Sequence, residues 1–214
     1  MHKNIINLDE IKKKIHLKNS NAKIIAVSKT FSLEKILPLV EHDHLDFGEN
    51  KVQEAIEKWT EIKKIKKKIN LHMVGKLQTN KVKFAVKIFD YIHSLDSLKL
   101  AKKISDEQRK IKKDIKLFIQ LNIGNENQKS GIKIEELDEF YKFCIKDLSL
   151  NIIGLMCLPP IESDSSIYFQ KMEKLSKNLN LKELSMGMSS DYLTAIEYKS
   201  TYVRIGTKIF GERS

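Results

Sequence analysis

Cysteine, proline and long apolar runs are scarce in this sequence of 214 residues. The only cysteines, Cys144 and Cys157, lie in apolar segments without metal-ligand spacing, so we expect packed, reduced thiols and neither a disulfide nor a metal site. No apolar run is long enough to span a bilayer, and the first residues do not resemble a signal peptide. We therefore expect a cytoplasmic protein with no membrane partner.

Arginine is also scarce, because all but three of the 39 basic residues are lysines. The formal net charge of +11 alone favours a polyanion partner. A nucleic-acid reader, however, interleaves arginines and stacking aromatic residues along one face, and no such stripe is present. The densest basic cluster, residues 63–68, falls at the end of a predicted helix, where cations suit the helix dipole. Weak, nonspecific polyanion binding stays open, and we expect no dedicated nucleic-acid partner.

With only three prolines and no Pro/Gly/Ser-rich linker, the chain is expected to form a single domain over residues 1–214. A helix over residues 4–18 comes first, and short apolar strands then alternate with amphipathic helices, the first two of which span about 32–41 and 50–59. The predicted strands cover residues 24–29, 45–48, 71–75, 91–95, 117–122, 152–157, 183–188 and 202–206.

Eight strands, each followed by a helical segment, favour an α/β fold: a closed, parallel (β/α)₈ barrel of the TIM type, preceded by an N-terminal helix. An open, doubly wound sheet is the alternative. Asp46, Asp90 and Asp114 lie near predicted strand ends and are interpreted as capping or turn residues.

Lys29 is the most informative single residue, because it stands at the carboxyl end of the apolar strand that begins at Ile24. In a parallel barrel this position faces the rim where such barrels keep their sites. Burial favours the uncharged amine, which can attack an aldehyde to form a Schiff base. The alternative is a lysine that extends from a strand end to water.

Polar residues also follow the last two predicted strands. The segment from Met186 to Asp191 carries serines at a strand end, and Gly206 and Thr207 follow the final strand. Backbone N–H groups and hydroxyls at adjacent strand ends can bind a phosphate. Together with a rim lysine they suggest a phosphorylated aldehyde, and pyridoxal phosphate fits that description. Several rim residues have an alternative role as helix caps: Asn50, Ser97, Ser190 and Asp191.

Seven motifs across nearly the whole chain carry a family resemblance. They are Ala26–Thr30, Phe47–Glu54, His72–Lys81, Gln120–Asn122 with Lys129–Gly131, Gly154–Met156, Leu184–Asp191 and Val203–Gly211. In these motifs the sequence resembles the pyridoxal phosphate homeostasis proteins, which are small relatives of the N-terminal barrel of alanine racemase.

The resemblance implies cofactor-binding roles for six residues. It implies a Schiff base between pyridoxal 5'-phosphate and Lys29, contacts to the phosphate from Ser189, Gly206 and Thr207, Arg204 beside the pyridine nitrogen, and Asn50 near the cofactor. Lys129 matches a family lysine at the pocket edge. Two positions depart from the family pattern: Phe31, where a lysine is common, and Lys76, where a histidine is usual. We expect neither to touch the Schiff base or the phosphate.

The resemblance also implies a function. An arginine beside the pyridine nitrogen disfavours its protonation and weakens the ring as an electron sink. Two-base racemisation further needs a second acid or base, which racemases of this lineage take from a C-terminal β-domain, and the sequence ends at Ser214 without one. We therefore expect a monomeric carrier of pyridoxal phosphate, with no catalytic residues of its own, that serves cofactor homeostasis and apo-enzymes. The alternatives are a pyridoxal-phosphate-dependent racemase or a barrel aldolase.

Overall fold

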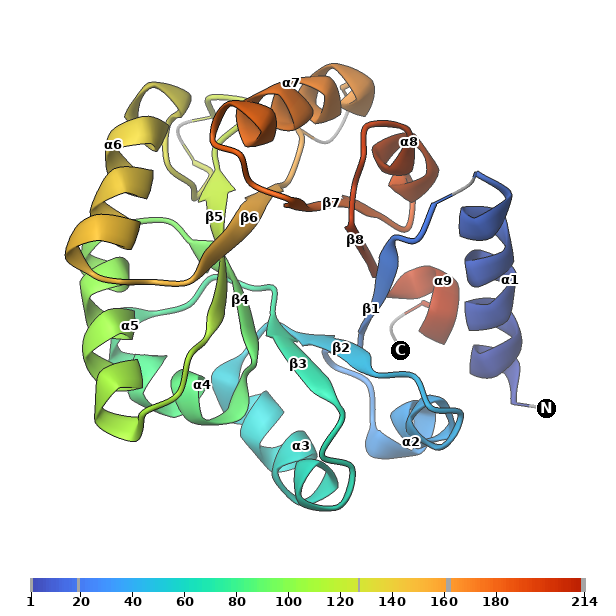
Figure 1. Ribbon diagram of the computed structural model, residues 1–214. Helices are drawn as coiled ribbons and strands as arrows, with labels where there is room; N and C mark the ends of the chain where they lie inside the picture. The colour runs from blue at the N-terminus through green and yellow to red at the C-terminus, as the bar shows by residue number, and fades with distance from the viewer. Residues whose placement is uncertain (1, 19, 127, 161–162, 213–214) are drawn as a thin grey trace.

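The structure, a computed structural model, describes residues 2–18, 20–126, 128–160 and 163–212. In these ranges eight parallel strands pair in sequence order and close into a barrel, because the last strand pairs with the first. Figure 1 looks into this barrel and shows the helices surrounding it. The predicted TIM-type barrel is confirmed, and the alternative of an open sheet is wrong because no strand is left at an edge among the described residues.

Strands and helices alternate along the chain. The strands are β1 (Lys23–Val27), β2 (Asp46–Glu49), β3 (Asn70–Met73), β4 (Tyr91–Leu95), β5 (Lys116–Leu121), β6 (Ile152–Cys157), β7 (Glu183–Met188) and β8 (Tyr202–Ile205). The α-helices are α1 (Lys3–Leu17), α2 (Leu33–Glu41), α3 (Val52–Ile65), α4 (Val82–Ile88), α5 (Leu98–Ile111), α6 (Leu137–Lys142), α7 (Ser165–Asn178), α8 (Tyr192–Glu197) and α9 (Thr207–Phe210). Short 3₁₀ turns cover Thr79–Lys81 and Ile134–Glu136, and a π-helical turn covers Phe143–Asp147.

The predicted strands agree closely with these bounds. The strands predicted over 91–95, 152–157 and 183–188 coincide with β4, β6 and β7. The strand predicted over 24–29 ends earlier, at Val27, so Lys29 lies in the turn after β1 and not within the strand. The helix predicted over 50–59 begins later and runs to Ile65.

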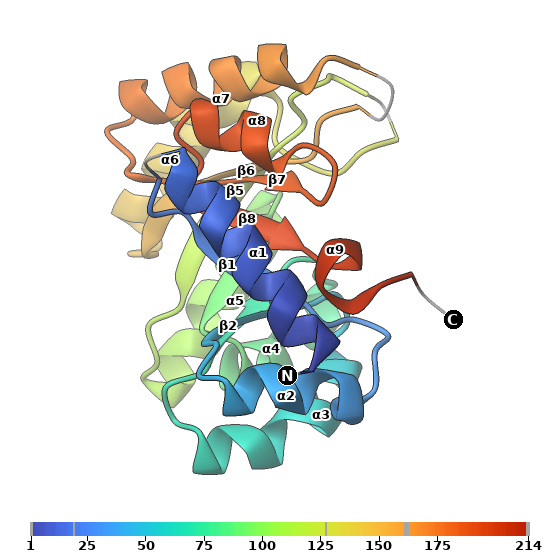
Figure 2. The ribbon, with the colours of Figure 1, turned by 90° about the vertical axis from the view of Figure 1, so that its right-hand side faces the viewer.

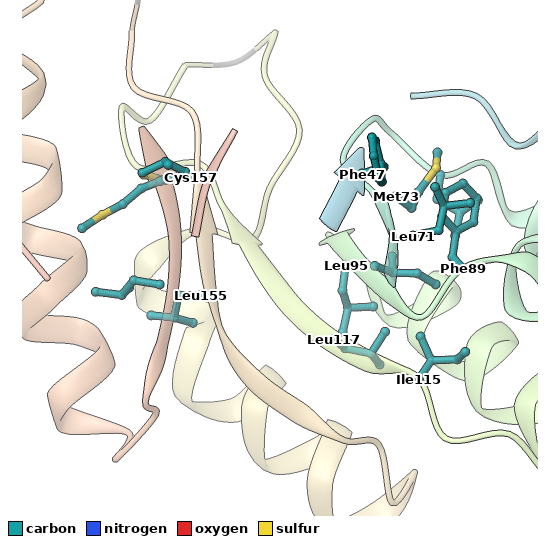
Figure 3. Close-up of a cluster of buried hydrophobic side chains, with 14 of the residues drawn as sticks. Phe47, Leu71, Met73, Phe89, Leu95, Ile115, Leu117, Leu155 and Cys157 are labelled. Atoms are coloured by element: carbon teal, nitrogen blue, oxygen red, sulfur yellow. The ribbon is translucent and has the colours of Figure 1, made fainter. Parts of the chain in front are cut away.

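Both faces of the strands are buried, as in other parallel barrels. In β1 the side chains of Ile25 and Val27 belong to a small cluster inside the barrel, whereas Ile24 and Ala26 belong to the larger core between the barrel and its helices. Figure 3 shows part of this larger core. The continuous β-branched run in the sequence therefore reflects burial on two sides.

Helix α1 packs against the end of the chain. Its apolar residues Leu8, Ile11 and Ile15 are buried, as their spacing predicts. The Asn7 amide nitrogen donates to the carbonyl of Ile209 at 2.9 Å, and Figure 2 shows α1 running beside α9. The N-terminal helix thereby covers the part of the barrel where β1 and β8 meet.

The cysteines match their predicted role as packed thiols, whereas Asp90 and Asp114 lie just before β4 and β5 and bind groups of other segments instead of capping a helix. Cys144 and Cys157 are buried free thiols, and burial raises the pKa of each to about 12. Asp90 accepts the backbone N–H of Leu71 at 2.8 Å, and Asp114 accepts the side chain of Asn151 at 2.7 Å. In the described ranges no helix is long and apolar enough to cross a membrane, and no metal-ligand cluster is present.

The prediction that Asp46 is a cap or turn residue is wrong. It is the first residue of β2, and its carboxylate contacts His72 at 3.0 Å and the side chain of Asn70 at 3.0 Å. A strand residue that binds a fully buried histidine contributes to the barrel interior.

Gly154 gives a test of the β6–β7 contact. A Cβ atom at this position would lie 2.0 Å from the backbone oxygen of Glu183, so one strand would have to move. We expect Gly154→Ala to lower the free energy of unfolding by about 1–3 kcal/mol, measured by urea denaturation. Gly206→Ala is the control, because its nearest atom would lie at 3.4 Å. Equal stability of the two variants would contradict the close β6–β7 packing.

Candidate functional site

A cavity of about 390 Å³ opens at the carboxyl ends of the strands, where β1, β2, β7 and β8 meet. Its volume lies in the range of about 300–1,000 Å³ that is typical of small-molecule sites. All six residues predicted to bind a cofactor line this cavity: Lys29, Asn50, Ser189, Arg204, Gly206 and Thr207. The remaining lining residues are Val27, Phe31, Val74, Leu158, Met188 and Ser190.

Phe31, the first departure from the family pattern, lines the same cavity. Its side chain is buried, and its ring centroid lies 5.0 Å from that of Phe210. The second departure from the family pattern, Lys76, is exposed and lines a neighbouring cavity.

The turn that carries Lys29 is held on both sides by polar groups of α3. The Thr30 N–H donates to the carboxylate of Glu54, and the Lys58 amine donates to the carbonyl of Ser28 at 3.0 Å. Thr30 has φ = 66°, a left-handed conformation that is costly for a β-branched residue. These contacts fix the backbone immediately before and after Lys29.

Glu49 supports this turn from the layer between the barrel and α3, and it is not among the residues predicted to form the site. Its side chain is 0% exposed, and its Oε1 accepts hydrogen bonds from the Ser28 hydroxyl at 2.7 Å and the Trp59 indole at 3.1 Å. Burial raises the pKa of this carboxyl, and the hydrogen bonds from Ser28 and Trp59 partly oppose that shift. In the sequence, Glu49 stands directly after the strand predicted over 45–48 and within the motif Phe47–Glu54.

The helix-cap alternatives for the rim residues have mixed outcomes. Ser97 caps α5, because its hydroxyl accepts the N–H of Leu100. Asn50 is not a cap, since Lys51 holds that position before α3 and Asn50 lines the cavity. Asp191 stands at the cap position of α8, but its carboxylate accepts the N–H of Met188 at 2.7 Å and closes the loop that carries Ser189 and Ser190.

The ends of β7 and β8 form the polar side of the cavity. The Ser189 hydroxyl accepts the N–H of Lys208 at 3.5 Å, which joins the loop after β7 to the first turn of α9. At Gly206 an added Cβ would make only ordinary contacts with Val27, so packing does not demand glycine. Because Gly206 lines the cavity, its missing side chain leaves space for a ligand to approach the backbone.

Arg204 brings a buried positive charge to the cavity. It is 5% exposed, and its guanidinium donates to the Ser185 hydroxyl at 2.7 Å and the Cys157 carbonyl at 2.9 Å. Among the described residues that line the cavity, Lys29 and Arg204 are cationic and none is acidic. The arrangement therefore favours an anionic ligand.

Lys129 lies in an adjoining cavity of about 320 Å³, which shares Asn50, Val74 and Leu158 with the first. Its amine pairs with the carboxylate of Glu126 at 2.6 Å. The structure thus places the lysine predicted at the pocket edge beside the main cavity and outside its lining.

Comparisons with known proteins all point to the same family. Residues 5–214 match the family described as alanine racemase, N-terminal domain. A pyridoxal phosphate homeostasis protein from Aquifex aeolicus is 37% identical over 90% of this chain and 87% of its own length. The protein with that name from Escherichia coli K12 is 34% identical over 89% of this chain and 85% of its own length.

Solved structures extend this similarity to the fold. PipY from Synechococcus elongatus, solved with PLP bound, has a TM-score of 0.88 and 30% identity, with 97% of this chain and 100% of PipY covered. Alanine racemase from Corynebacterium glutamicum has a TM-score of 0.72 at 17% identity, with 96% of this chain and 60% of the racemase covered. The second comparison shows a shared fold alone.

The contact between Glu54 and the lysine turn gives a pH-dependent prediction. Burial raises the pKa of Glu54, but hydrogen bonds from Lys58 and the Thr30 N–H outweigh it and hold the pKa below its ordinary value of 4.5. The stabilisation is therefore complete above pH 4.5 and disappears as the pH falls through the lower folded-state pKa. We expect Glu54→Gln to lower the free energy of unfolding by about 1 kcal/mol at pH 7 and by less below pH 4.5.

Urea denaturation between pH 7 and pH 3 measures this difference. Glu57→Gln is the matched control, because Glu57 lies on the same helix and, within the part of the chain that the structure describes, accepts a hydrogen bond from the exposed side chain of Gln53. A loss of stability in Glu54→Gln that stays constant over this pH range would contradict the assigned contact.

Proposed function

Because this chain belongs to the alanine racemase N-terminal domain family, and within it to the pyridoxal phosphate homeostasis proteins, we propose that it binds pyridoxal 5'-phosphate in the cavity at the strand ends. The family resemblance predicted from the motifs is confirmed by these relatives. The observation that carries the proposal is that Lys29 and the polar ends of β7 and β8 line one cavity.

The residues of the cavity match the three reactive parts of this cofactor. Its aldehyde suits an amine, its phosphate suits hydroxyl and N–H donors, and its ring nitrogen suits a charged donor. Lys29 supplies the amine, Ser189, Gly206 and Thr207 supply the donors, and Arg204 supplies the charged group. Asn50 lies on the β2 side of the same cavity and is assigned to the cofactor as well.

Lys29 is the residue we assign to the covalent linkage. When bound, pyridoxal phosphate supplies an electrophilic aldehyde carbon that can exchange between amines. The Lys29 amine would hold the cofactor by this carbon as a Schiff base, with water as the leaving group. The hydrogen bond from the Thr30 N–H to Glu54 and the one from Lys58 to the Ser28 carbonyl hold the backbone on both sides of Lys29.

We further propose that the protein stores or delivers the cofactor and has no robust turnover. Racemisation needs a second group on the opposite face of the ligand that can gain and lose a proton. Among the described residues around the cavity, Lys29 is the sole side chain suited to that task, because a guanidinium stays protonated. The alternative is a pyridoxal-phosphate-dependent amino-acid racemase, whose fold this chain shares at low identity.

The same proposal includes the setting in which the protein acts. We assign it to the cytoplasm as a monomer that exchanges pyridoxal phosphate with apo-enzymes. A Schiff base exchanges readily with an incoming amine, so a cofactor held in this way is stored on the protein and can still be released. This supports a role in cofactor homeostasis.

The covalent linkage can be tested directly with purified protein and added pyridoxal phosphate. We expect the wild type to show the absorbance of a Schiff base, and borohydride followed by mass spectrometry to place the reduced adduct on Lys29. Lys29→Ala should lose both signals. Lys76→Ala is the control, because Lys76 is an exposed lysine in the neighbouring cavity, and it should keep them.

Two results would contradict the proposal. A reduced adduct on another lysine, with none on Lys29, would reject the assigned linkage. Release of racemised amino acid in large excess over the protein would show an enzyme and reject the carrier role.

A further inference from the structure

A continuous chain of hydrogen bonds crosses the interior of the barrel and ends on Arg204. The Asp46 carboxylate lies 3.0 Å from His72 Nε2, and His72 Nδ1 lies 2.9 Å from His93 Nε2. His93 Nδ1 lies 2.8 Å from the Ser185 hydroxyl, which lies 2.7 Å from Arg204 Nη1. The chain links the start of β2 with β8 through residues of β3, β4 and β7.

The direction of every hydrogen bond between Asp46 and Arg204 follows from the two charged groups at the ends. A guanidinium only donates, so the Ser185 oxygen accepts from Arg204. At the other end an ionised Asp46 carboxylate only accepts, so a neutral His72 donates to it from Nε2 and accepts at Nδ1. His93 then carries its proton on Nε2 and donates to His72 Nδ1. Its own Nδ1 therefore accepts the proton of the Ser185 hydroxyl.

Burial supports the neutral form that this order requires. His72 and His93 are each 0% exposed. His93 stacks on Phe118 and His72 stacks on Tyr91, with ring centroids 4.2 Å apart in both pairs. Burial lowers the pKa of both histidines, so neither carries a second proton at neutral pH.

Asp46, at the end of this series of hydrogen bonds, is an ionised carboxylate. Burial raises the pKa of Asp46, but the hydrogen bonds from His72 and Asn70 outweigh it and lower the pKa overall. Two opposite charges, on Arg204 and Asp46, are thus joined by three neutral groups whose dipoles all point the same way.

We propose that Asp46, His72, His93 and Ser185 are positioning residues that fix the guanidinium of Arg204 at the cavity. The Ser185 hydroxyl holds Nη1 and the Cys157 carbonyl holds Nη2, so the plane of the guanidinium is set. This series of hydrogen bonds from Asp46 to Arg204, called the relay below, does not conduct protons, because the reversed order would require the ionised Asp46 carboxylate to donate a hydrogen bond. This inference rests on the proposed function where it concerns pyridoxal phosphate, and on the geometry alone where it concerns the histidine tautomers.

The tautomers are tested first, on the protein without added cofactor. Nitrogen-15 NMR of the histidine side chains at neutral pH should show His72 and His93 as neutral rings protonated on Nε2. A charged ring, or a proton on Nδ1, at either residue would overturn the relay. This result does not depend on pyridoxal phosphate binding.

The link to the cavity is tested with three variants, each checked by urea denaturation for a folded protein. Ser185→Ala removes the acceptor for Arg204, and we expect pyridoxal phosphate to bind about tenfold more weakly and its absorption maximum to shift. Ser185→Thr keeps a hydroxyl and should restore most of both properties. His44→Gln is the matched control. His44 is a buried histidine beside Asp46, whose backbone oxygen it contacts, and it is not part of the relay.

The possible results separate the positioning role from the proposed function. A folded Ser185→Ala protein with wild-type affinity and spectrum would reject the positioning role. The same holds if His44→Gln has effects as large as those of Ser185→Ala, since buried histidines would then act through general stability. If the wild type does not bind pyridoxal phosphate, the proposed function fails, while the NMR result still decides whether the relay exists.

Discussion

The pairing of β8 with β1 is the contact on which the rest of the structure depends. Four residues of each strand lie opposite one another, Lys23–Ala26 of β1 and Tyr202–Ile205 of β8, and this register closes the barrel. Closure brings Gly206 and Thr207, from the end of the chain, to the rim that carries Lys29. Helix α1 covers this part of the barrel and contacts α9, α2 and α8. The same contact therefore completes the fold and assembles the candidate site.

The barrel interior combines two kinds of packing. An apolar cluster that includes Ile25, Phe118 and Met156 fills part of it, and the hydrogen-bonded side chains between Asp46 and Arg204 cross the rest. Stacking of the histidine rings on Tyr91 and Phe118 lets these polar groups pack like apolar ones. A buried arginine is costly unless its donors are satisfied, and here the interior supplies partners for its two terminal nitrogens.

The sequence predicts the fold well because each strand is a short apolar run with its own helix. It also predicts which residues face the main cavity, since the carboxyl ends of parallel strands share one rim and the family motifs mark Lys29, Arg204 and Gly206. The contacts across the barrel could not be predicted. His72 and His93 each lie inside an apparently apolar strand, and their meeting depends on the tilt and register of β3 and β4. The role of Asp46 is hidden in the sequence for the same reason, and that of Glu49 because its partners Ser28 and Trp59 belong to other segments.

The central claim is that one cavity binds one pyridoxal phosphate through three groups of residues. A crystal structure of the protein grown with this cofactor tests the claim most directly. The account predicts continuous density from the Lys29 nitrogen to the cofactor, with the phosphate beside Ser189, Gly206 and Thr207 and the ring nitrogen beside Arg204. Density for the cofactor elsewhere, or in this cavity with the phosphate turned away from β7 and β8, would contradict it.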